Sequence, residues 1–447
     1  MSEEPSAAVK VSKVGAFTAA CLLVSNAVGS GIFTTTGFQA RDIGDPTTIL
    51  VLWVVGGLLA LTGAMSYGEL GAALPRVGGE YIYLRRAFGP LVGFLSGWMS
   101  FTVGFGAAIA AGAMGFAAYF AALFPSSEGY GTLIGLILVW SLTAVHLVSL
   151  ETGGRFQRWI TILKIGAVVV GIGVALAFGG GDVAHLGERT PGVDPGIGSL
   201  AIALIFVMYA FSGWNAASYI AGEMEDPARN LPRALVGGTL FITGFYVVVN
   251  LVYFYALSPE ALAAEPVLPV AEKVATSLFG PNAAALVSAV LCISIAGSTS
   301  SMIWAGPRVY EAMAGDGVAP KVLAKRSARG VPAAAILAQS VWISALLFTG
   351  TFEQLVVYAG FALAIFSAMG VGCVIALRIR EPELERPYRV GFYPWVPLLY
   401  IASSLWIALY AAWEQPTETL LSVLTVAIGV PVYYVWLRVR VQPPSST

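Results

Sequence analysis

The chain has 447 residues, of which 57% are hydrophobic and 11% are charged, and its formal net charge is −1. A composition this apolar, with a mean hydropathy of +0.79, excludes a set of soluble domains and indicates a polytopic membrane protein. The near-neutral charge excludes an electrostatic nucleic-acid binder, and the three cysteines, all in apolar stretches, imply no disulfide framework.

Apolar stretches long enough to cross about 30 Å of hydrocarbon occur about twelve times along the chain. They predict an all-α protein with about 12 transmembrane helices, in which residues 1–447 form one membrane domain. One outer loop has apolar residues at helical spacing, which predicts a short surface helix around Ala261–Leu278. The expected spans are 15–38, 47–70, 90–123, 131–149, 156–178, 198–222, 233–257, 282–307, 332–349, 354–377, 392–412 and 417–437.

The positive charges predict the orientation of these spans. If the N-terminus is cytoplasmic, 20 of the 24 Lys and Arg residues fall in cytoplasmic segments, and only Arg41, Arg189 and Lys273 fall outside. This asymmetry supports an even number of spans and a multi-pass protein of the inner (plasma) membrane with both termini in the cytoplasm. The remaining cation, Lys164, lies within the fifth span.

The first span contains Gly29-Ser30-Gly31 near the place where it would cross the bilayer midplane. Glycine costs roughly 1 kcal/mol against alanine in a helix interior, so this triplet is a candidate break. A break within lipid is tolerated only where the freed backbone groups line a cavity or bind something. The N–H groups of Ser30, Gly31 and Ile32 would then begin a half-helix whose positive dipole end suits a carboxylate. The alternative is a close-packing site for a neighbouring helix, and the triplet alone favours neither.

The sixth span has a similar interruption at Ser212-Gly213, followed by Trp214. Taken alone, Gly213 would be a packing glycine and Trp214 an ordinary core aromatic. Interrupted helices at matching places in two halves, however, point to a transporter site near the membrane midplane. The paired breaks predict a 5+5 inverted repeat with residues 15–178 as the first half, 198–377 as the second and 392–437 as two extra spans.

The residues around these breaks also carry a family resemblance. Gly29-Ser30-Gly31-Ile32-Phe33 resembles the first-span signature of the amino acid–polyamine–organocation (APC) superfamily. The block Gly213-Trp214-Asn215 with the segment 223–234 is similar to the L-type amino acid transporter branch. Further stretches that resemble the superfamily are Tyr67-Gly68-Glu69-Leu70, Gly78-Gly79-Glu80-Tyr81-Ile82-Tyr83-Leu84, Ala87-Phe88-Gly89 and Ala314-Gly315-Asp316-Gly317.

The resemblance implies the LeuT fold, alternating access, and a free amino acid held between the two unwound spans. The substrate carboxylate would meet the N–H groups of the first break, and the ammonium would meet backbone carbonyls. A half-helix N-terminus suits an anion and unwound carbonyls suit a cation, so a zwitterion fits both. Tyr209 occupies the gating position. The residues expected at the substrate are Ala27, Ser30, Gly31, Ile32, Tyr209, Ser212, Trp214 and Asn215. For Asn215, capping of the second half of the sixth helix is an equal alternative.

Lys164 lies about eight residues into the fifth span, and an intramembrane lysine costs roughly 2.5–3.5 kcal/mol on insertion scales. It would therefore be functional, or it would snorkel toward the cytoplasmic face. In sodium-independent relatives, the resemblance implies a fifth-span lysine where other members of the fold hold a sodium ion. We expect its ammonium to tie the first-span carbonyls to eighth-span hydroxyls, with proton coupling left open. The hydroxyls are Ser298, Thr299 and Ser301, which could instead bond between helices.

Glu69 and Glu80 flank a cytoplasmic loop rich in arginine, where a solvated charge cluster is the expectation. No acidic residue is expected near either break, which favours neutral substrates over cationic ones. Channel filters, metal-ligand spacing and a nucleotide-binding loop are not visible, so no enzyme activity, metal or cofactor is expected.

Together with these patterns, the resemblance implies a sodium-independent exchanger or permease for neutral L-amino acids. The alternatives are a proton-coupled amino acid symporter and a transporter of cationic amino acids or polyamines with the same fold. The expected partners are free amino acids and the lipid bilayer. Eukaryotic L-type transporters carry a cysteine after the third span for a disulfide-linked heavy chain. Residues 125–130 contain none, so we expect a stand-alone, prokaryotic transporter.

Overall fold

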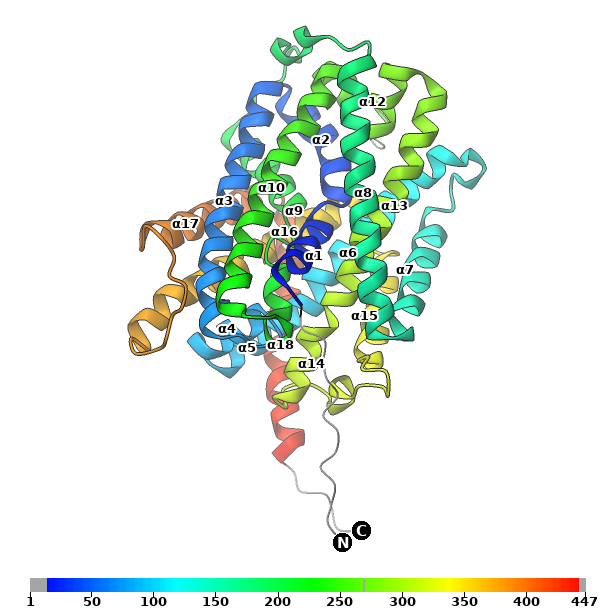
Figure 1. Ribbon diagram of the computed structural model, residues 1–447. Coiled ribbons are helices and arrows are strands. Elements are labelled where there is room, and N and C mark those ends of the chain that lie inside the picture. The colour runs from blue at the N-terminus through cyan, green and yellow to red at the C-terminus, as the bar shows by residue number, and fades with distance from the viewer. Residues whose placement is uncertain (1–13, 268–269, 442–447) are drawn as a thin grey trace.

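The computed structural model describes residues 14–267 and 270–441, and these residues form a bundle of helices (Figure 1). Within them, ten helices are long and apolar enough to cross a membrane, and Ile197–Ala210 and Ala333–Leu346 are shorter apolar helices. The all-α architecture of about 12 predicted spans is thereby confirmed. The helices of the predicted spans are α1 Ala16–Ala27, α2 Ser30–Ile43, α3 Pro46–Ala73, α5 Pro90–Met99, η1 Ser100–Gly104, α6 Phe105–Leu123, α7 Gly131–Val148, α8 Leu150–Phe178, α9 Ile197–Ala210, η4 Ala216–Glu223, α10 Pro227–Ala256, α13 Pro281–Ala305, α15 Ala333–Leu346, α16 Phe352–Arg380, α17 Trp395–Glu414 and α18 Pro416–Val441.

Short helices connect these spans. The predicted surface helix around Ala261–Leu278 is two helices, α11 (Pro259–Ala263) and α12 (Val270–Phe279). Pro266 lies between them and has no N–H to donate, so a continuous helix cannot form there. The other short elements are η2 Pro125–Ser127, η3 Val183–Gly187, α4 Glu80–Phe88, α14 Pro307–Gly315 and η5 Lys321–Ala324.

Both predicted breaks are present. In the first span α1 ends at Ala27 and α2 begins at Ser30, and Val28 and Gly29 between them have non-helical backbone conformations. In the sixth span α9 ends at Ala210, turns occupy residues 211–215, and the 3₁₀ helix η4 follows. The helix that follows the second break, η4, is a short 3₁₀ helix, whereas α2 is a longer α-helix with a larger dipole. The start of α2 is therefore the better place for an anion.

Packing places the broken spans among the other helices, and Figure 1 shows α1 between α10 and α8. The first span packs against α10 and α13 through α1 and against α9 through α2. By contrast α8 is peripheral, because only 17% of its most apolar window is buried inside the protein. The breaks are therefore screened from lipid, as their exposed backbone groups require.

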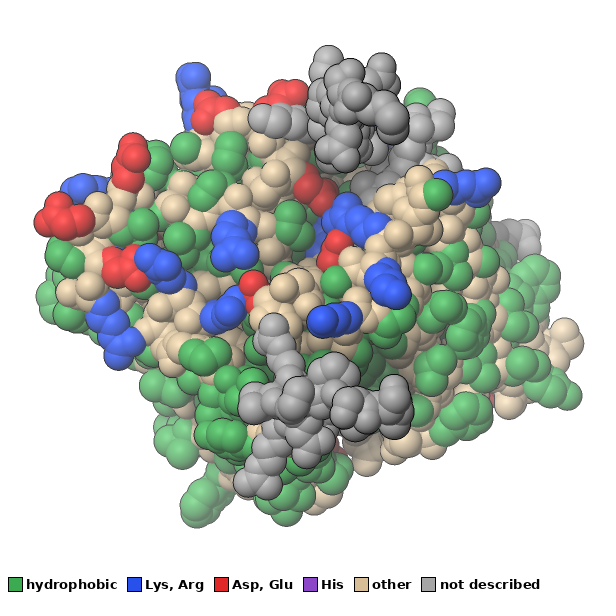
Figure 2. All heavy atoms as spheres, turned by 90° about the horizontal axis from the view of Figure 1, so that it is seen from below, with side chains coloured by type: hydrophobic (Ala, Val, Ile, Leu, Met, Phe, Trp, Pro, Cys, Tyr) green, Lys and Arg blue, Asp and Glu red, His purple; other side chains and the backbone are tan. Residues whose placement is uncertain are grey.

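The charged side chains gather on one end of the bundle. Figure 2 shows Lys and Arg on the face that carries the termini, with hydrophobic side chains around its margin. This distribution agrees in kind with the predicted charge asymmetry. Some cations in that prediction lie outside the described residues, namely Lys10 and Lys13 and the side chains of Arg155, Arg438 and Arg440.

Candidate functional site

The two breaks lie against each other. A methyl group added at Gly31 would stand 2.5 Å from the Cα atom of Ala210, where α9 ends. The hydroxyl groups of Ser30 and Tyr209 are 3.2 Å apart and join the two spans directly. Gly213 has a φ of +101°, and a methyl group there would meet the Asn26 side chain at 2.8 Å. Glycine is therefore needed at 31 for close approach and at 213 for backbone conformation as well.

A small cavity lies between the breaks, and the residues that line it carry no formal charge. The first N–H groups of a helix have no acceptor within that helix, so those at the start of α2, on Ser30, Gly31 and Ile32, are available to a ligand. The cavity can thus receive an anionic group at one wall while offering backbone carbonyls elsewhere. Its lining residues are Asn26, Ala27, Gly29, Ser30, Gly31, Ala108, Gly112, Tyr209, Ser212, Ser298, Thr299 and Met302.

The carbonyl groups that end α1 and α9 meet at one hydroxyl. The Oη atom of Tyr246, from α10, lies 2.6 Å from the Ala27 oxygen and 2.8 Å from the Ala210 oxygen. A single O–H can be shared between two such acceptors, so this tyrosine holds the ends of both half-helices together. The sequence reasoning missed Tyr246, which is one aromatic among many in an apolar span.

Lys164 is completely buried, and its ammonium group donates to the carbonyls of Ser25 and Val28, each at 2.7 Å. The snorkelling interpretation is therefore wrong, because the side chain runs into the bundle toward the first break. The expected contact with α1 is present. Gln157, two turns earlier on α8, donates to the Ser25 hydroxyl of α1 and to the Gly297 carbonyl of α13, the latter at 3.3 Å.

The eighth-span hydroxyls do not receive the ammonium in the way the sequence suggested. Ser298 donates to the Ile295 carbonyl and Ser301 to the Ser298 carbonyl, both at 2.9 Å within α13. Thr299 Oγ1 is buried, has no hydrogen-bond partner within the described part of the chain, and lines the cavity between the breaks. Serine hydroxyls in helices readily bond to a carbonyl one turn back, which explains why these two serines bond within α13. The hydrogen bond that joins α8 to α13 comes from Gln157 instead.

Glu80 corrects two expectations. Its side chain is 2% exposed, so it does not belong to a solvated charge cluster. One carboxyl oxygen accepts from the Tyr67 hydroxyl at 2.6 Å and from the Asn215 amide at 2.9 Å. An acidic side chain therefore does lie beside the second break, and Asn215 binds it rather than capping η4. Burial raises the pKa of the Glu80 carboxyl above its ordinary value, although its hydrogen-bond donors oppose the shift.

A larger pocket adjoins the small cavity on the side of α4, the end of the bundle that carries the termini in Figure 1. Asn26, Tyr209 and Ser212 line both spaces, which are thus adjacent at the breaks. Glu80 and Trp214 line only the larger pocket, and the Trp214 ring packs edge-on against Tyr67 and Tyr400. The other aromatic at the second break, Tyr209, meets Phe352 edge to face.

The architecture just described consists of two broken helices around a polar cavity, and it can be compared with known proteins. A family model described as amino acid permease matches residues 14–435, nearly the whole chain. The chain belongs to the amino acid permease family. Its activity is accordingly amino acid transport across a membrane rather than enzymatic chemistry, as the sequence predicted.

Individual relatives of this permease align over most of their own length. It is 30% identical to the "Serine/threonine exchanger SteT" of Bacillus subtilis (strain 168), over 94% of this chain and 96% of that protein. It is 29% identical to the mouse "Large neutral amino acids transporter small subunit 2", over 94% and 80% respectively. The human "Asc-type amino acid transporter 1" is 28% identical over 96% and 83%.

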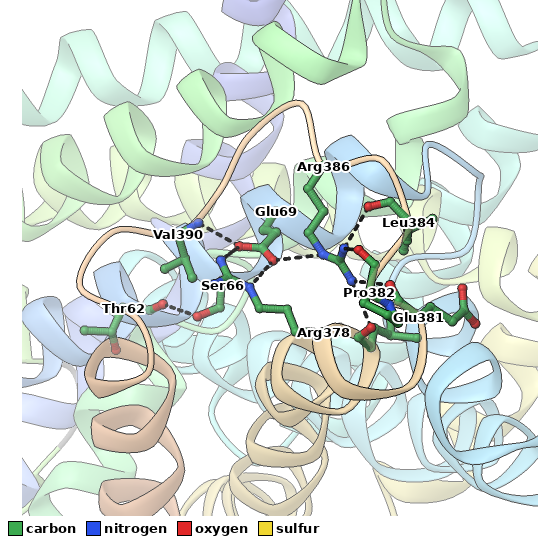
Figure 3. Close-up of polar contacts among 10 residues, drawn as sticks. Thr62, Ser66, Glu69, Arg378, Glu381, Pro382, Leu384, Arg386 and Val390 are labelled. Carbon is green, nitrogen blue, oxygen red and sulfur yellow. Dashed lines mark hydrogen bonds and ion pairs between the residues drawn. The ribbon is translucent and has the colours of Figure 1, made fainter.

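A separate cluster on the face of the permease that carries the termini contains Glu69, which Figure 3 shows between two arginines. Arg378 donates to both oxygens of Glu69 at 2.9 and 2.6 Å, and Arg386 lies 3.5 Å away. The Val390 N–H donates to the same carboxylate at 2.7 Å. Glu69 is therefore a buried ion-pair residue that joins α3 to the end of α16 and the following loop. The expectation that Glu69 belongs to a solvated charge cluster is therefore wrong.

Proposed function

We propose that this protein exchanges neutral L-amino acids across the plasma membrane by alternating access, without sodium. The observation that carries the proposal is the uncharged cavity between the two breaks, beside the free N–H groups of α2. A zwitterion can place its carboxylate at that helix start and its ammonium at unwound carbonyls such as those of Ala27, Tyr209 and Ser212. Trp214 and Asn215 would contact the part of the substrate nearer the larger pocket.

Sodium independence is supported by the fixed cation at Lys164. Its ammonium donates to the Ser25 and Val28 carbonyls at the end of α1, which are groups of the kind that coordinate sodium in transporters with broken helices. Because a buried ammonium group already bonds to these carbonyl oxygens, they are not free to coordinate a sodium ion. The proposed substitute for an ion site is Lys164 with its α1 carbonyls, together with Ser298, Thr299 and Ser301 of α13. Of these three, Ser298 and Thr299 line the cavity between the breaks.

Neutral side chains and exchange are supported by the absence of charge among the described residues of the small cavity and by the printed names of the relatives. A cationic side chain in that cavity would need a carboxylate to neutralise it. Tyr209 is the proposed gate, because its hydroxyl reaches across the cavity to Ser30. We propose a chain that works without a disulfide-linked heavy chain, with both termini in the cytoplasm.

Counterflow in proteoliposomes tests the proposal. Vesicles loaded with unlabelled leucine, alanine, serine, lysine or putrescine would be diluted into radiolabelled leucine, with and without sodium. The expected result is uptake driven by internal neutral amino acids, unchanged by sodium and not supported by lysine or putrescine. Uptake that requires sodium, or that is driven equally by putrescine, would contradict it. Empty liposomes and vesicles without an internal amino acid are the controls.

A further inference from the structure

Glu80 is a buried acid to which no positive side chain among the described residues is bonded. The hydrogen bonds described for its carboxyl group come from Tyr67 and Asn215, and Ser367 lies within hydrogen-bond reach. All three donors are neutral. The arginines of the same loop are engaged elsewhere, since Arg85 pairs with Asp316 and Arg86 with Glu381. An ionised carboxylate in this position therefore needs a cation or a proton that the described side chains do not supply.

The aromatic side chains that line the pocket with Glu80 suit an ammonium group. Trp214, Tyr219 and Tyr400 line the same pocket, and each is buried. Aromatic faces attract ammonium ions through the quadrupole of the ring, most strongly for tryptophan and where water is excluded. A carboxylate among several such rings is a built site for an organic cation. A metal ion would want several oxygen ligands instead.

The position of the pocket indicates which cation can reach it. This pocket shares Asn26, Tyr209 and Ser212 with the small cavity, so an amino acid that leaves the breaks toward the termini enters it first. We infer that Glu80 and its aromatic neighbours form a second binding position for the substrate's ammonium group, between the breaks and the face that carries the termini. The inference rests on the proposed transport of free amino acids.

This position would also make transport sensitive to pH. Near Glu80 the titratable groups are Tyr67 from α3, Tyr83 from α4, Tyr219 from η4, Cys373 from α16 and Tyr400 from α17. None of these is a cation at neutral pH. Because burial raises the pKa of the Glu80 carboxyl, a proton competes with the ammonium as the pH falls. Ammonium binding at this position is thus present at higher pH and lost on acidification.

Two analogues of leucine test the inference with purified protein. 3-Methylbutylamine keeps the ammonium and lacks the carboxylate, whereas 4-methylpentanoate keeps only the carboxylate. Each would compete with radiolabelled leucine for wild type, Glu80→Gln and Glu80→Asp, with Glu381→Gln as a matched control outside the pocket. In Glu80→Gln we expect the amine to lose about tenfold in potency, with the carboxylate analogue unchanged, because a charge-assisted hydrogen bond is lost. Glu80→Asp keeps the carboxylate, so the amine should lose less potency in this variant than in Glu80→Gln.

Equal losses for both analogues would show a merely structural role, and unchanged potencies would show no role, so either result overturns the inference. If Glu80→Gln does not fold, the wild type still decides. Its inhibition by the amine should weaken as the pH is lowered below neutrality, whereas inhibition by the carboxylate should not. A flat amine profile contradicts the inference. Counterflow by the wild type tests the proposed function separately, because it can succeed whether or not Glu80 binds the amine.

Discussion

At the scale of single residues, the energetics of Lys164 favour its buried position. Placing a lysine within the membrane costs roughly 2.5–3.5 kcal/mol on insertion scales. Hydrogen bonds to charged groups contribute about 1.5–3 kcal/mol each. The two carbonyls at 2.7 Å, from Ser25 and Val28, are therefore enough to offset the insertion cost. The bonds also fix the end of α1, where the first break begins.

Lys164→Ala should impair transport, because it leaves two carbonyls beside the break without their donor. We expect the initial rate of leucine counterflow to fall at least about tenfold, the equivalent of one charged hydrogen bond. The measurement is uptake per milligram of reconstituted protein. Lys273→Ala is the matched control, since that ammonium also bonds to carbonyls but lies in the short helix α12. Unimpaired transport by Lys164→Ala would refute the assigned role.

Gly31→Ala tests the close approach of the two breaks. The added methyl group would meet the Ala210 backbone at 2.5 Å, so α2 and α9 must separate. We expect a loss of about 1–3 kcal/mol in unfolding free energy and a loss of leucine binding. Thermal melting and equilibrium binding measure the two effects. Gly244→Ala in α10 is the control, because no other group lies within 4 Å of its added methyl. Equal behaviour of the two variants would refute the argument.

At the scale of elements, α10 acts as the brace of the two broken spans. It packs against α1 and α3, and Tyr246 brings its hydroxyl to the carbonyl ends of both α1 and α9. Asn250, one turn later, accepts a hydrogen bond at 2.7 Å from Thr36 in α2. One continuous helix therefore contacts both sides of the first break and the end of α9. Any motion that moves these half-helices apart must break its hydrogen bonds.

Tyr246→Phe should loosen this brace while keeping the ring. We expect thermal stability to fall by about 1 kcal/mol and leucine binding to weaken, because the carbonyls of Ala27 and Ala210 lose their shared donor. Tyr255→Phe is the matched control, since it lies on the same helix and removes a bond to the Gly179 carbonyl, away from the breaks. A binding defect of the same size in both variants would argue against a specific role for Tyr246.

At the scale of the whole molecule, ion pairs fasten the face that carries the termini. Glu69 joins α3 to α16 and its following loop, and Asp316 after α14 pairs with Arg85 of α4. A buried acid between arginines is costly to break, because removing one partner leaves the other charge unpaired. An exposed pair such as Arg86 with Glu381 contributes little. The strength of this face thus depends on burial more than on the number of charges.

Glu69→Gln should therefore destabilise the protein by about 3 kcal/mol or more. Arg86→Ala, which removes an exposed pair, should cost under about 1 kcal/mol. Thermal melting of the two variants in detergent, compared with the wild type, measures the difference. Similar melting temperatures for both variants would contradict the distinction between buried and exposed pairs.

The helical spans and both breaks could be predicted because their signals are local. A run of apolar residues, Gly29-Ser30-Gly31 and Ser212-Gly213 each depend on neighbours in the sequence. The roles of Glu80, Tyr246 and Gln157 depend on what other spans bring to them, and no spacing in the chain encodes that. Glu80 was misjudged for this reason, since its arginine neighbours in sequence pair with other acids in space. The inverted repeat stays a prediction.

The peripheral placement of α8 has a mechanical consequence. This helix carries Lys164 and Gln157 on its inner side, whereas Trp159 and Leu163 are 72% and 57% exposed on the other. Its outward side chains would rest on acyl chains, so lateral pressure and bilayer thickness act on it directly. A displacement of the helix would act on the end of α1 through the two hydrogen bonds of the Lys164 ammonium. We therefore expect the transport rate to change with bilayer thickness, which vesicles of graded acyl length would measure.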